Sequence, residues 1–326
     1  MMKRILFSVL AIFITNFTVF AQASNYDFKI VGYYSLNAAS SKVGSFPFEK
    51  VTHVNLWFLN PDSLGNYTRD ISRIKKFIEK AHQYDVKVLF SIGGGGRHAY
   101  YHALLQDDKR PMLIQNLMSE VNKYGVDGVD VDLEGRDIDM NYEKFVVELA
   151  GKLKAQNKLI TSAIAVYYKD QLSDVALSQY DFVNIMVYDR TGPWRPAEPG
   201  PHSLYDHAVE DLKYFGEERG MTKEKLVLGV PFYGYGFGPD TTYRVSSMNY
   251  RQIIKEFRGS ENADEWKMQD GSTIYYNGIP TIKQKTILAR DKASGIMIWQ
   301  LAGDAKGSKS LLRAINEAKE VNTGIF

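Results

Sequence analysis

The stretch DGVDVDLEG, residues 127–135, alternates acidic and apolar side chains. Successive side chains of a β-strand point to opposite faces, so Asp130, Asp132 and Glu134 would share one face and the intervening valines and leucine the other. Isolated carboxylates that leave water are costly, so these three must be hydrogen-bonded or partly protonated. Grouped carboxyls of this kind could transfer protons or hold a cation. The stretch therefore predicts an acid-lined functional site.

A metal site is one alternative interpretation of the same stretch, because D-x-D-x-E supplies hard oxygen ligands. The calcium-loop pattern requires a glycine at its sixth position and an acid at its twelfth. Counted from Asp127, those positions hold Asp132 and Ile138. A polar surface strand is a second alternative, although the stretch lies between two amphipathic segments. We expect no metal and no cofactor.

The elements that would position these acids alternate along the chain. Short apolar runs predict strands at 29–34, 53–59, 87–92, 128–133, 159–166, 182–188, 225–231 and 295–301. Apolar residues at i, i+3, i+4 spacing predict helices at 70–84, 111–124, 142–156, 204–218, 281–290 and 309–319. The first crossover, 35–51, shows little helical pattern.

This alternation predicts an α/β fold, a (β/α)8 TIM barrel, with a doubly wound open sheet as the alternative. Glu134 would then lie at the C-terminal end of its strand, the barrel face that carries catalytic residues. The long gap between the last two strands contains STIYYNG, which alternates like a strand and ends in a turn signal. We therefore expect a single catalytic domain over residues 24–326, with a small insertion after strand 7, around 235–280.

The N-terminus has the features of a secretory signal peptide. Lys3 and Arg4 precede an apolar run, and Ala21-Gln22-Ala23 provides small residues for cleavage. The apolar run is shorter than the roughly 20 residues needed to span a bilayer. We expect residues 1–23 to be removed and the protein to be secreted, extracellular or periplasmic, without a membrane anchor.

The composition excludes some partners. Residues 1–23 hold two of the 40 Lys and Arg residues and no acids, so the remaining 38 balance the 38 Asp and Glu residues. A neutral chain without basic blocks argues against nucleic acid and anionic membranes as partners. The chain has no cysteine, so its stability must come from a large core. Aromatic residues make up 13% of the chain, including 21 tyrosines, which suits a sugar-binding cleft.

DGVDVDLE resembles the D-G-x-D-x-D-x-E signature of glycoside hydrolase family 18, the chitinases and endo-β-N-acetylglucosaminidases. Other segments resemble that family's strands in the same order, namely VGYY, VTHVNLWF, VLFSIGG, NIMVYD, LGVPFYG and GIMIWQLAGD. The resemblance covers nearly the whole chain after residue 24. It implies a secreted hydrolase that cleaves β-1,4 bonds at N-acetylglucosamine in chitin or chito-oligosaccharides.

The resemblance also implies a retaining, substrate-assisted mechanism, which this family uses in place of a protein nucleophile. Glu134 would protonate the leaving oxygen while the substrate's 2-acetamido oxygen attacks C1, giving an oxazolinium intermediate. Asp132 would orient the acetamido N–H, and Asp130 would share a proton with Asp132. Glu134 would then act as the base for water. Tyr188 matches the tyrosine that binds the acetamido oxygen.

Further residues match the substrate-binding positions of the family. Met186 and Asp189 would line the sugar pocket, and Trp299 would form its floor. The remaining matches are the aromatic residues Tyr33 and Phe58 and the glycine run that includes Gly94, where no G-K-[S/T] follows to suggest a phosphate loop.

Three departures from the family pattern predict a shallower cleft. Gly95 stands where the family often has a tryptophan, Tyr235 stands where an arginine is common, and the insertion is reduced. Within the same chemistry, an endo-β-N-acetylglucosaminidase acting on N-glycans is the alternative. From a different class, a chitin-binding lectin-like barrel would lack the acid, whereas Glu134 is present. We expect a monomer whose partner is an N-acetylglucosamine-containing oligo- or polysaccharide.

Overall fold

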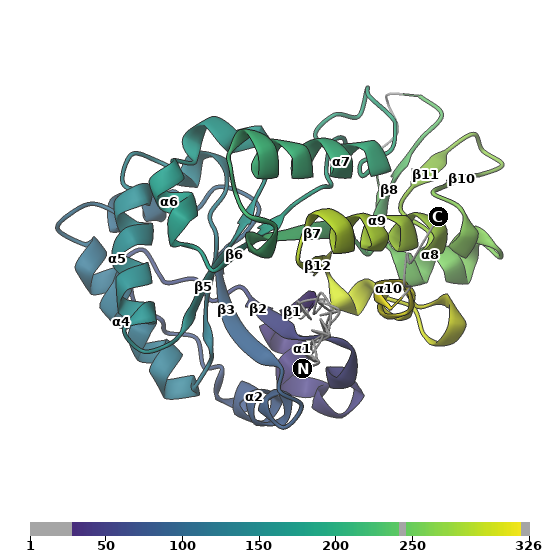
Figure 1. Ribbon diagram of the computed structural model, residues 1–326. Coiled ribbons are helices and arrows are strands. Elements are labelled where there is room, and N and C mark those ends of the chain that lie inside the picture. The colour runs from purple at the N-terminus through teal and green to yellow at the C-terminus, as the bar shows by residue number, and fades with distance from the viewer. Residues whose placement is uncertain (1–27, 241–245, 321–326) are drawn as a thin grey trace, which may run out of the picture.

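The computed structural model describes residues 28–240 and 246–320, which form a closed barrel of parallel strands surrounded by helices (Figure 1). Around the barrel the strands follow the order β1, β12, β7, β6, β5, β4, β3 and β2. Their bounds are β1 (Lys29–Ser35), β2 (His53–Trp57), β3 (Lys87–Gly93), β4 (Gly128–Asp132), β5 (Leu159–Ile164), β6 (Phe182–Ile185), β7 (Leu226–Pro231) and β12 (Gly295–Trp299). The predicted (β/α)8 barrel is confirmed, and the open sheet is excluded by the β1–β12 pairing that closes the ring.

Helices cover the outside of the barrel, where the apolar faces of the strands point (Figure 1). The helices in the described parts of the chain are α1 (Leu36–Ser41), α2 (Lys75–His82), α3 (Tyr100–Leu104), α4 (Arg110–Tyr124), α5 (Tyr142–Lys154), α6 (Asp174–Gln179), α7 (Tyr205–Lys213), α8 (Tyr250–Glu256), α9 (Ile279–Lys292) and α10 (Leu311–Lys319). The six predicted helices are confirmed in position. The first crossover contains the short α1, which begins where the Ser35 hydroxyl accepts a hydrogen bond from Ala38 N.

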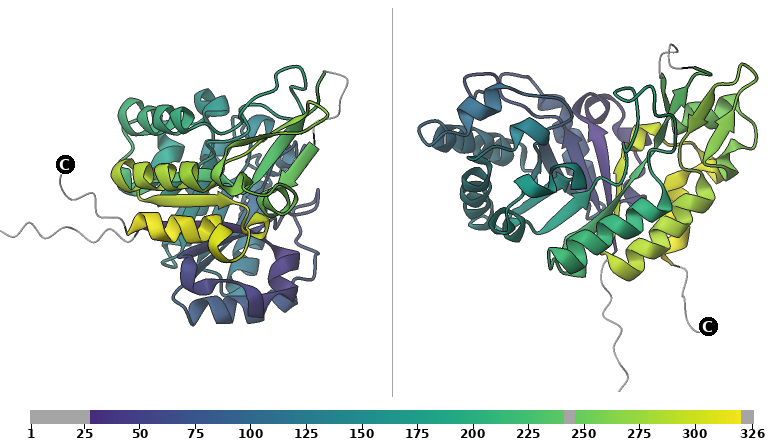
Figure 2. Two further views of the ribbon diagram at one scale, coloured as in Figure 1. Left: turned by 90° about the vertical axis from the view of Figure 1, so that its right-hand side faces the viewer. Right: turned by 90° about the horizontal axis from the view of Figure 1, so that it is seen from above.

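The insertion after β7 forms a second, antiparallel sheet in the order β10, β11, β8, β9. Its strands are β8 (Tyr233–Phe237), β9 (Ser246–Asn249), β10 (Glu265–Lys267) and β11 (Thr273–Tyr275). Together with α8 they stand beside the barrel (Figure 2). The predicted strand in STIYYNG is β11, so the expected insertion is confirmed.

The expected signal peptide, residues 1–23, lies outside the described residues. Within the described part of the chain, the model contains no helix with the length and apolar character that a membrane span requires.

Candidate active site

Asp130 lies in the barrel interior, fully buried on β4. Its Oδ2 accepts hydrogen bonds from the hydroxyls of Tyr33 (2.6 Å) and Ser91 (2.8 Å). Its Oδ1 accepts from the Thr161 hydroxyl at 2.6 Å and from Asn184 Nδ2 at 3.2 Å. Burial raises the pKa of this carboxyl, and the four donors oppose that rise. Since each donor satisfies a lone pair, the arrangement suits the ionised form of Asp130.

Asp132 follows on the same inward face and is only 3% exposed. Its Oδ1 is buried and has no hydrogen-bond partner among the described residues. Burial, followed by the negative charges of Glu134 and Asp130, holds the pKa of Asp132 well above its ordinary value. Because Asp130 is surrounded by donors and Asp132 is not, the proton of this pair belongs on Asp132.

Glu134 lies two residues after the end of β4, at the C-terminal mouth of the barrel. Burial raises the pKa of its carboxyl from 4.5 to about 7, with a further contribution from the negative charge of Asp189 and a smaller one from Asp137. The nearby Tyr168 hydroxyl opposes the rise. A carboxyl that titrates near neutral pH can both donate and accept a proton, as a general acid–base residue must.

The carboxyl of Glu134 faces a cleft of about 340 Å³. The cleft is lined by Gly95, Glu134, Ala165, Tyr167, Tyr168, Met186, Tyr188, Asp189, Arg190, Trp194 and Arg195. Four of the predicted site residues are therefore brought together here, namely Glu134, Met186, Tyr188 and Asp189. Asp130 and Asp132 do not line the cleft and lie buried in the barrel beside it.

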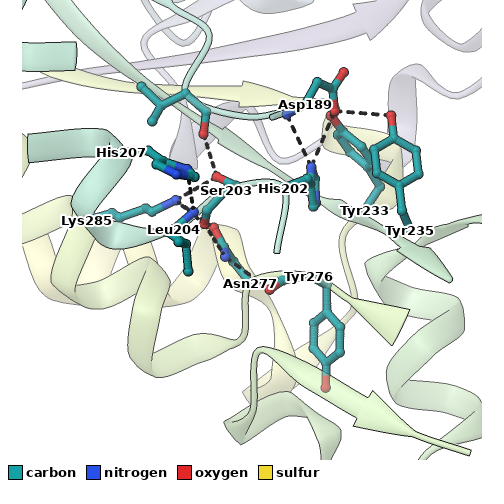
Figure 3. A network of polar contacts seen from close by, with 11 residues as sticks. Asp189, His202, Ser203, Leu204, His207, Tyr233, Tyr235, Tyr276, Asn277 and Lys285 are labelled. Atoms are coloured by element: carbon teal, nitrogen blue, oxygen red, sulfur yellow. Dashed lines mark hydrogen bonds and ion pairs between the residues drawn. The ribbon is translucent and has the colours of Figure 1, made fainter. Parts of the chain in front are cut away.

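The segment after β6 places Tyr188 and Asp189 in the cleft. Asp189 has a positive φ of 62°, which few residues other than glycine adopt. Its Oδ1 accepts hydrogen bonds from the hydroxyls of Tyr233 and Tyr235, the latter at 3.1 Å, and lies 3.4 Å from His202 Nδ1 (Figure 3). Tyr235, which stands where the family often has an arginine, therefore orients Asp189. The Tyr188 hydroxyl lies 3.8 Å from Met297 Sδ.

Trp299 ends β12 at the mouth of the barrel, within a cluster of aromatic rings. Its ring centroid is 5.2 Å from Tyr33, 5.4 Å from Trp57 and 5.9 Å from Phe58, to which it is stacked. Tyr33 is 1% exposed and its hydroxyl is bonded to Asp130, so it reaches the acids from within the barrel. Phe58 covers Gly94, where a Cβ would come within 2.2 Å of the phenyl ring.

The described residues include no group of three or more His, Cys, Asp or Glu side chains that could hold a metal ion. Both oxygens of Asp130 are already occupied by hydroxyl and amide donors. The geometry therefore gives no support to the alternative in which D-x-D-x-E binds a cation.

Sequence reasoning missed the donors around Asp130 and much of the cleft wall. Ser91, Thr161 and Asn184 each interrupt an apolar strand at an inward position, and that interruption was the available signal. Tyr168 and Trp194 lie on connections after β5 and β6, where no periodic pattern identifies them.

Comparison with known proteins identifies the family to which this chain belongs. The model described as "Glycosyl hydrolases family 18" matches residues 29–304. A class V chitinase of Medicago truncatula is 27% identical over 318 residues, covering 79% of this chain and 82% of that protein. A solved chitinase from the chitin utilization locus of Flavobacterium johnsoniae shares 35% sequence identity and superposes with a TM-score of 0.80, covering 89% of this chain and 93% of that one. A solved chitinase from Bacteroides thetaiotaomicron has 27% identity, a TM-score of 0.77, and coverage of 91% and 98%. The chain is thus a glycoside hydrolase and belongs to glycosyl hydrolase family 18.

Proposed function

We propose that the protein hydrolyses β-1,4 bonds at N-acetylglucosamine in chitin or chito-oligosaccharides, by a retaining, substrate-assisted mechanism. The observation that carries this proposal is the pairing of two unlike carboxyls. Glu134 opens on the cleft with a pKa of about 7, whereas Asp132 is buried with an unpartnered Oδ1. The similar proteins that are named chitinases support the choice of substrate.

In the first step, protonated Glu134 donates its proton to the leaving glycosidic oxygen. The acetamido oxygen of the substrate attacks C1 as that bond breaks, so the substrate supplies the nucleophile and an oxazolinium forms. The buried Oδ1 of Asp132 has no hydrogen-bond partner among the described residues, so it can accept a hydrogen bond from the acetamido N–H. Glu134, now ionised, then takes a proton from the incoming water, whose oxygen bonds to C1 as the bond between C1 and the acetamido oxygen breaks.

The sugar would be held by the residues around this pair. The Tyr188 hydroxyl would bind the acetamido oxygen, and Met186 and Asp189 would line the pocket. Trp299 is not among the residues that line the cleft, but it packs against the buried cluster that contains Tyr188. It would form the floor beneath the sugar, supported by Phe58 and, from within the barrel, by Tyr33. Gly94 would serve this floor indirectly, because its missing Cβ leaves room for the Phe58 ring.

The absence of a side chain at Gly95 bears on the shape of the cleft. A Cβ at this position would lie 3.8 Å from Glu134 Oε1, with no other atom close by. A larger side chain here would cover the acid, and glycine leaves it open to solvent. This supports the shallow cleft proposed from the sequence.

We further propose that residues 1–23 direct export and are removed, that residues 24–326 act as one catalytic domain, and that the enzyme works as a monomer in the periplasm or outside the cell. Mass spectrometry of the protein recovered from its native host would give the mature N-terminus. A chain that retains Met1 in the cytoplasm would contradict the export proposal.

Product analysis on two substrates tests the proposed activity. Chito-oligosaccharides should be shortened, and a high-mannose glycopeptide should be left intact. Release of the glycan from the glycopeptide alone would establish the endo-β-N-acetylglucosaminidase instead. Binding of chito-oligosaccharides with no products from either substrate would indicate a lectin.

A further inference from the structure

Helix α9 carries a lysine that is fully enclosed by protein. Lys285 is 0% exposed, and its Nζ donates to Ser203 O at 2.9 Å, to Ser203 Oγ at 2.7 Å and to Asn277 Oδ1 at 2.9 Å. Three neutral acceptors therefore take up its three protons, and no carboxylate of the described residues lies within ion-pair distance of Nζ. A buried cation without such a partner is costly, so its presence calls for a reason.

Ser203, the main partner of Lys285, is bonded to the chain that carries the catalytic cleft. The Ser203 hydroxyl donates to the carbonyl oxygen of Val187, the residue that precedes Tyr188. The preceding residue, His202, lies with its Nδ1 at 3.4 Å from both the backbone N and the Oδ1 of Asp189 (Figure 3). The two ends of the segment 187–203 are thus joined to each other at the point where Lys285 holds them.

The insertion is tied to the same point. Asn277, which follows β11, donates from Nδ2 to Ser203 O at 2.8 Å and accepts from Lys285 through Oδ1. Loss of the ammonium would leave the Ser203 hydroxyl oxygen and the Asn277 Oδ1 without this donor in the interior. Buried polar groups that lose a partner move or admit water, since the unmade bond costs about 1–3 kcal/mol.

We propose that Lys285 is a positioning residue for the hydrolysis: by holding Ser203 and Asn277 it fixes the segment 187–203, and with it Tyr188 and Asp189, against the cleft. The inference rests on the proposed function for its kinetic consequence. The hydrogen bonds of Lys285 go to Ser203 and Asn277, neither of which lines the cleft, so Lys285 acts on the cleft through these two residues.

Glu134 provides a readout that a purely stabilising role would not change. The negative charge of Asp189 helps to raise the pKa of Glu134, together with burial and Asp137 and against the Tyr168 hydroxyl. If Asp189 moves away, the pKa of Glu134 falls. In a plot of kcat/KM against pH, the fall at high pH (the alkaline limb) then moves to lower pH. Burial lowers the pKa of Lys285 itself from 10.5 to about 7, and the negative charges of Asp264 and Asp211 oppose that fall.

The test compares Lys285→Met, which keeps an unbranched side chain one atom shorter and without the charge, with Thr286→Val. Thr286 is equally buried on α9, but its hydroxyl donates only to Ile282 O within the helix. On a chito-oligosaccharide, Lys285→Met should lower kcat/KM about 10- to 100-fold, as expected for a displacement of about 1 Å. Its alkaline limb should move to lower pH, and Thr286→Val should keep both wild-type values.

Hydrogen exchange read by mass spectrometry gives a second measurement that needs no turnover. Peptides that cover the segment 187–203 should exchange faster in Lys285→Met and at the wild-type rate in Thr286→Val. If the wild-type enzyme hydrolyses nothing, the proposed function fails and the exchange data still decide this inference. A folded Lys285→Met protein with wild-type kcat/KM, alkaline limb and exchange would overturn it.

Ser203→Ala covers the case in which Lys285→Met does not fold. This variant removes the hydroxyl that joins Lys285 to Val187 and leaves the Ser203 carbonyl in place for Lys285. Loss of one such bond should reduce kcat/KM roughly 2- to 10-fold and move the alkaline limb in the same direction. Wild-type kinetics and exchange in Ser203→Ala would count against the proposal.

Discussion

Replacing Glu134 by glutamine should abolish most turnover and, in the same protein, stabilise the fold in a pH-dependent way. The pKa of Glu134 is raised from 4.5 to about 7, chiefly because burial disfavours the charged form. At about 1.36 kcal/mol per pKa unit, that difference corresponds to a cost of roughly 3 kcal/mol for holding the ionised carboxyl in the folded protein.

The sign of the effect follows from the two pKa values. Below pH 4.5 the carboxyl is protonated in both the folded and the unfolded state, so it costs nothing. Above pH 7 it is ionised in both states, and the folded state bears the full cost. Glutamine cannot ionise, so the free energy of unfolding of Glu134→Gln should match that of the wild type near pH 4. Near pH 8 it should be more stable by roughly 3 kcal/mol, or about 5 °C in Tm for a chain of this size.

Calorimetric unfolding at pH 4 and pH 8 measures this difference, with Glu79→Gln as the matched control. Glu79 is exposed on α2, and its replacement removes the same formal charge from the surface. Hydrolysis of a chito-oligosaccharide by Glu134→Gln should fall by about 10²- to 10⁴-fold. The reasoning is refuted if Glu134→Gln keeps near-normal turnover, or if its stability relative to the wild type is the same at both pH values.

Three further outcomes are expected. In the pH profile of kcat/KM, the fall on the alkaline side should lie near pH 7, because Glu134 must be protonated in the first step. Asp189→Asn should move this fall to lower pH, because it removes a negative charge that raises the pKa of Glu134. A fall at the same pH in wild type and variant would show that Asp189 does not act on Glu134. A thiazoline sugar, which mimics the oxazolinium intermediate, should bind less tightly to Tyr188→Phe as a competitive inhibitor. The loss of binding free energy should be about 0.5–1.5 kcal/mol for the hydrogen bond from the Tyr188 hydroxyl, or up to ~3 kcal/mol if that bond is charge-assisted. Equal inhibition constants would contradict this proposed hydrogen bond. A chelator should leave activity unchanged, whereas loss that one divalent ion restores would favour a metal site.

The barrel was predictable because its strands are buried on both sides and read as apolar runs. The ends of the strands were less predictable. The strand predicted over 182–188 ends at Ile185, because the Val187 N–H donates a hydrogen bond back to Ile185 O at 3.0 Å. The helix α6 was not among the predicted helices, because six residues are too few for the 3.6-residue period to stand out.

The acids of the site were predictable from their alternation on one strand, and their chemical difference was not. Asp130 and Asp132 look equivalent in the sequence. Only the folded sheet brings Thr161 from the neighbouring β5 and Asn184 from β6 to Asp130, whereas Asp132 Oδ1 has no partner among the described residues. The same holds for Lys285, whose burial depends on the packing of α9 against a segment far away in sequence.

The most direct test of substrate-assisted hydrolysis uses matched β-1,4 oligomers that differ only at C2 of the cleaved sugar. We expect hydrolysis of the oligomer with a 2-acetamido group and none of those with a free 2-amine or a 2-hydroxyl, because only the first carries the internal nucleophile. Comparable hydrolysis of chitin and cellulose oligomers would contradict the proposed role of the acetamido group, and with it the roles assigned to Asp132 and Tyr188.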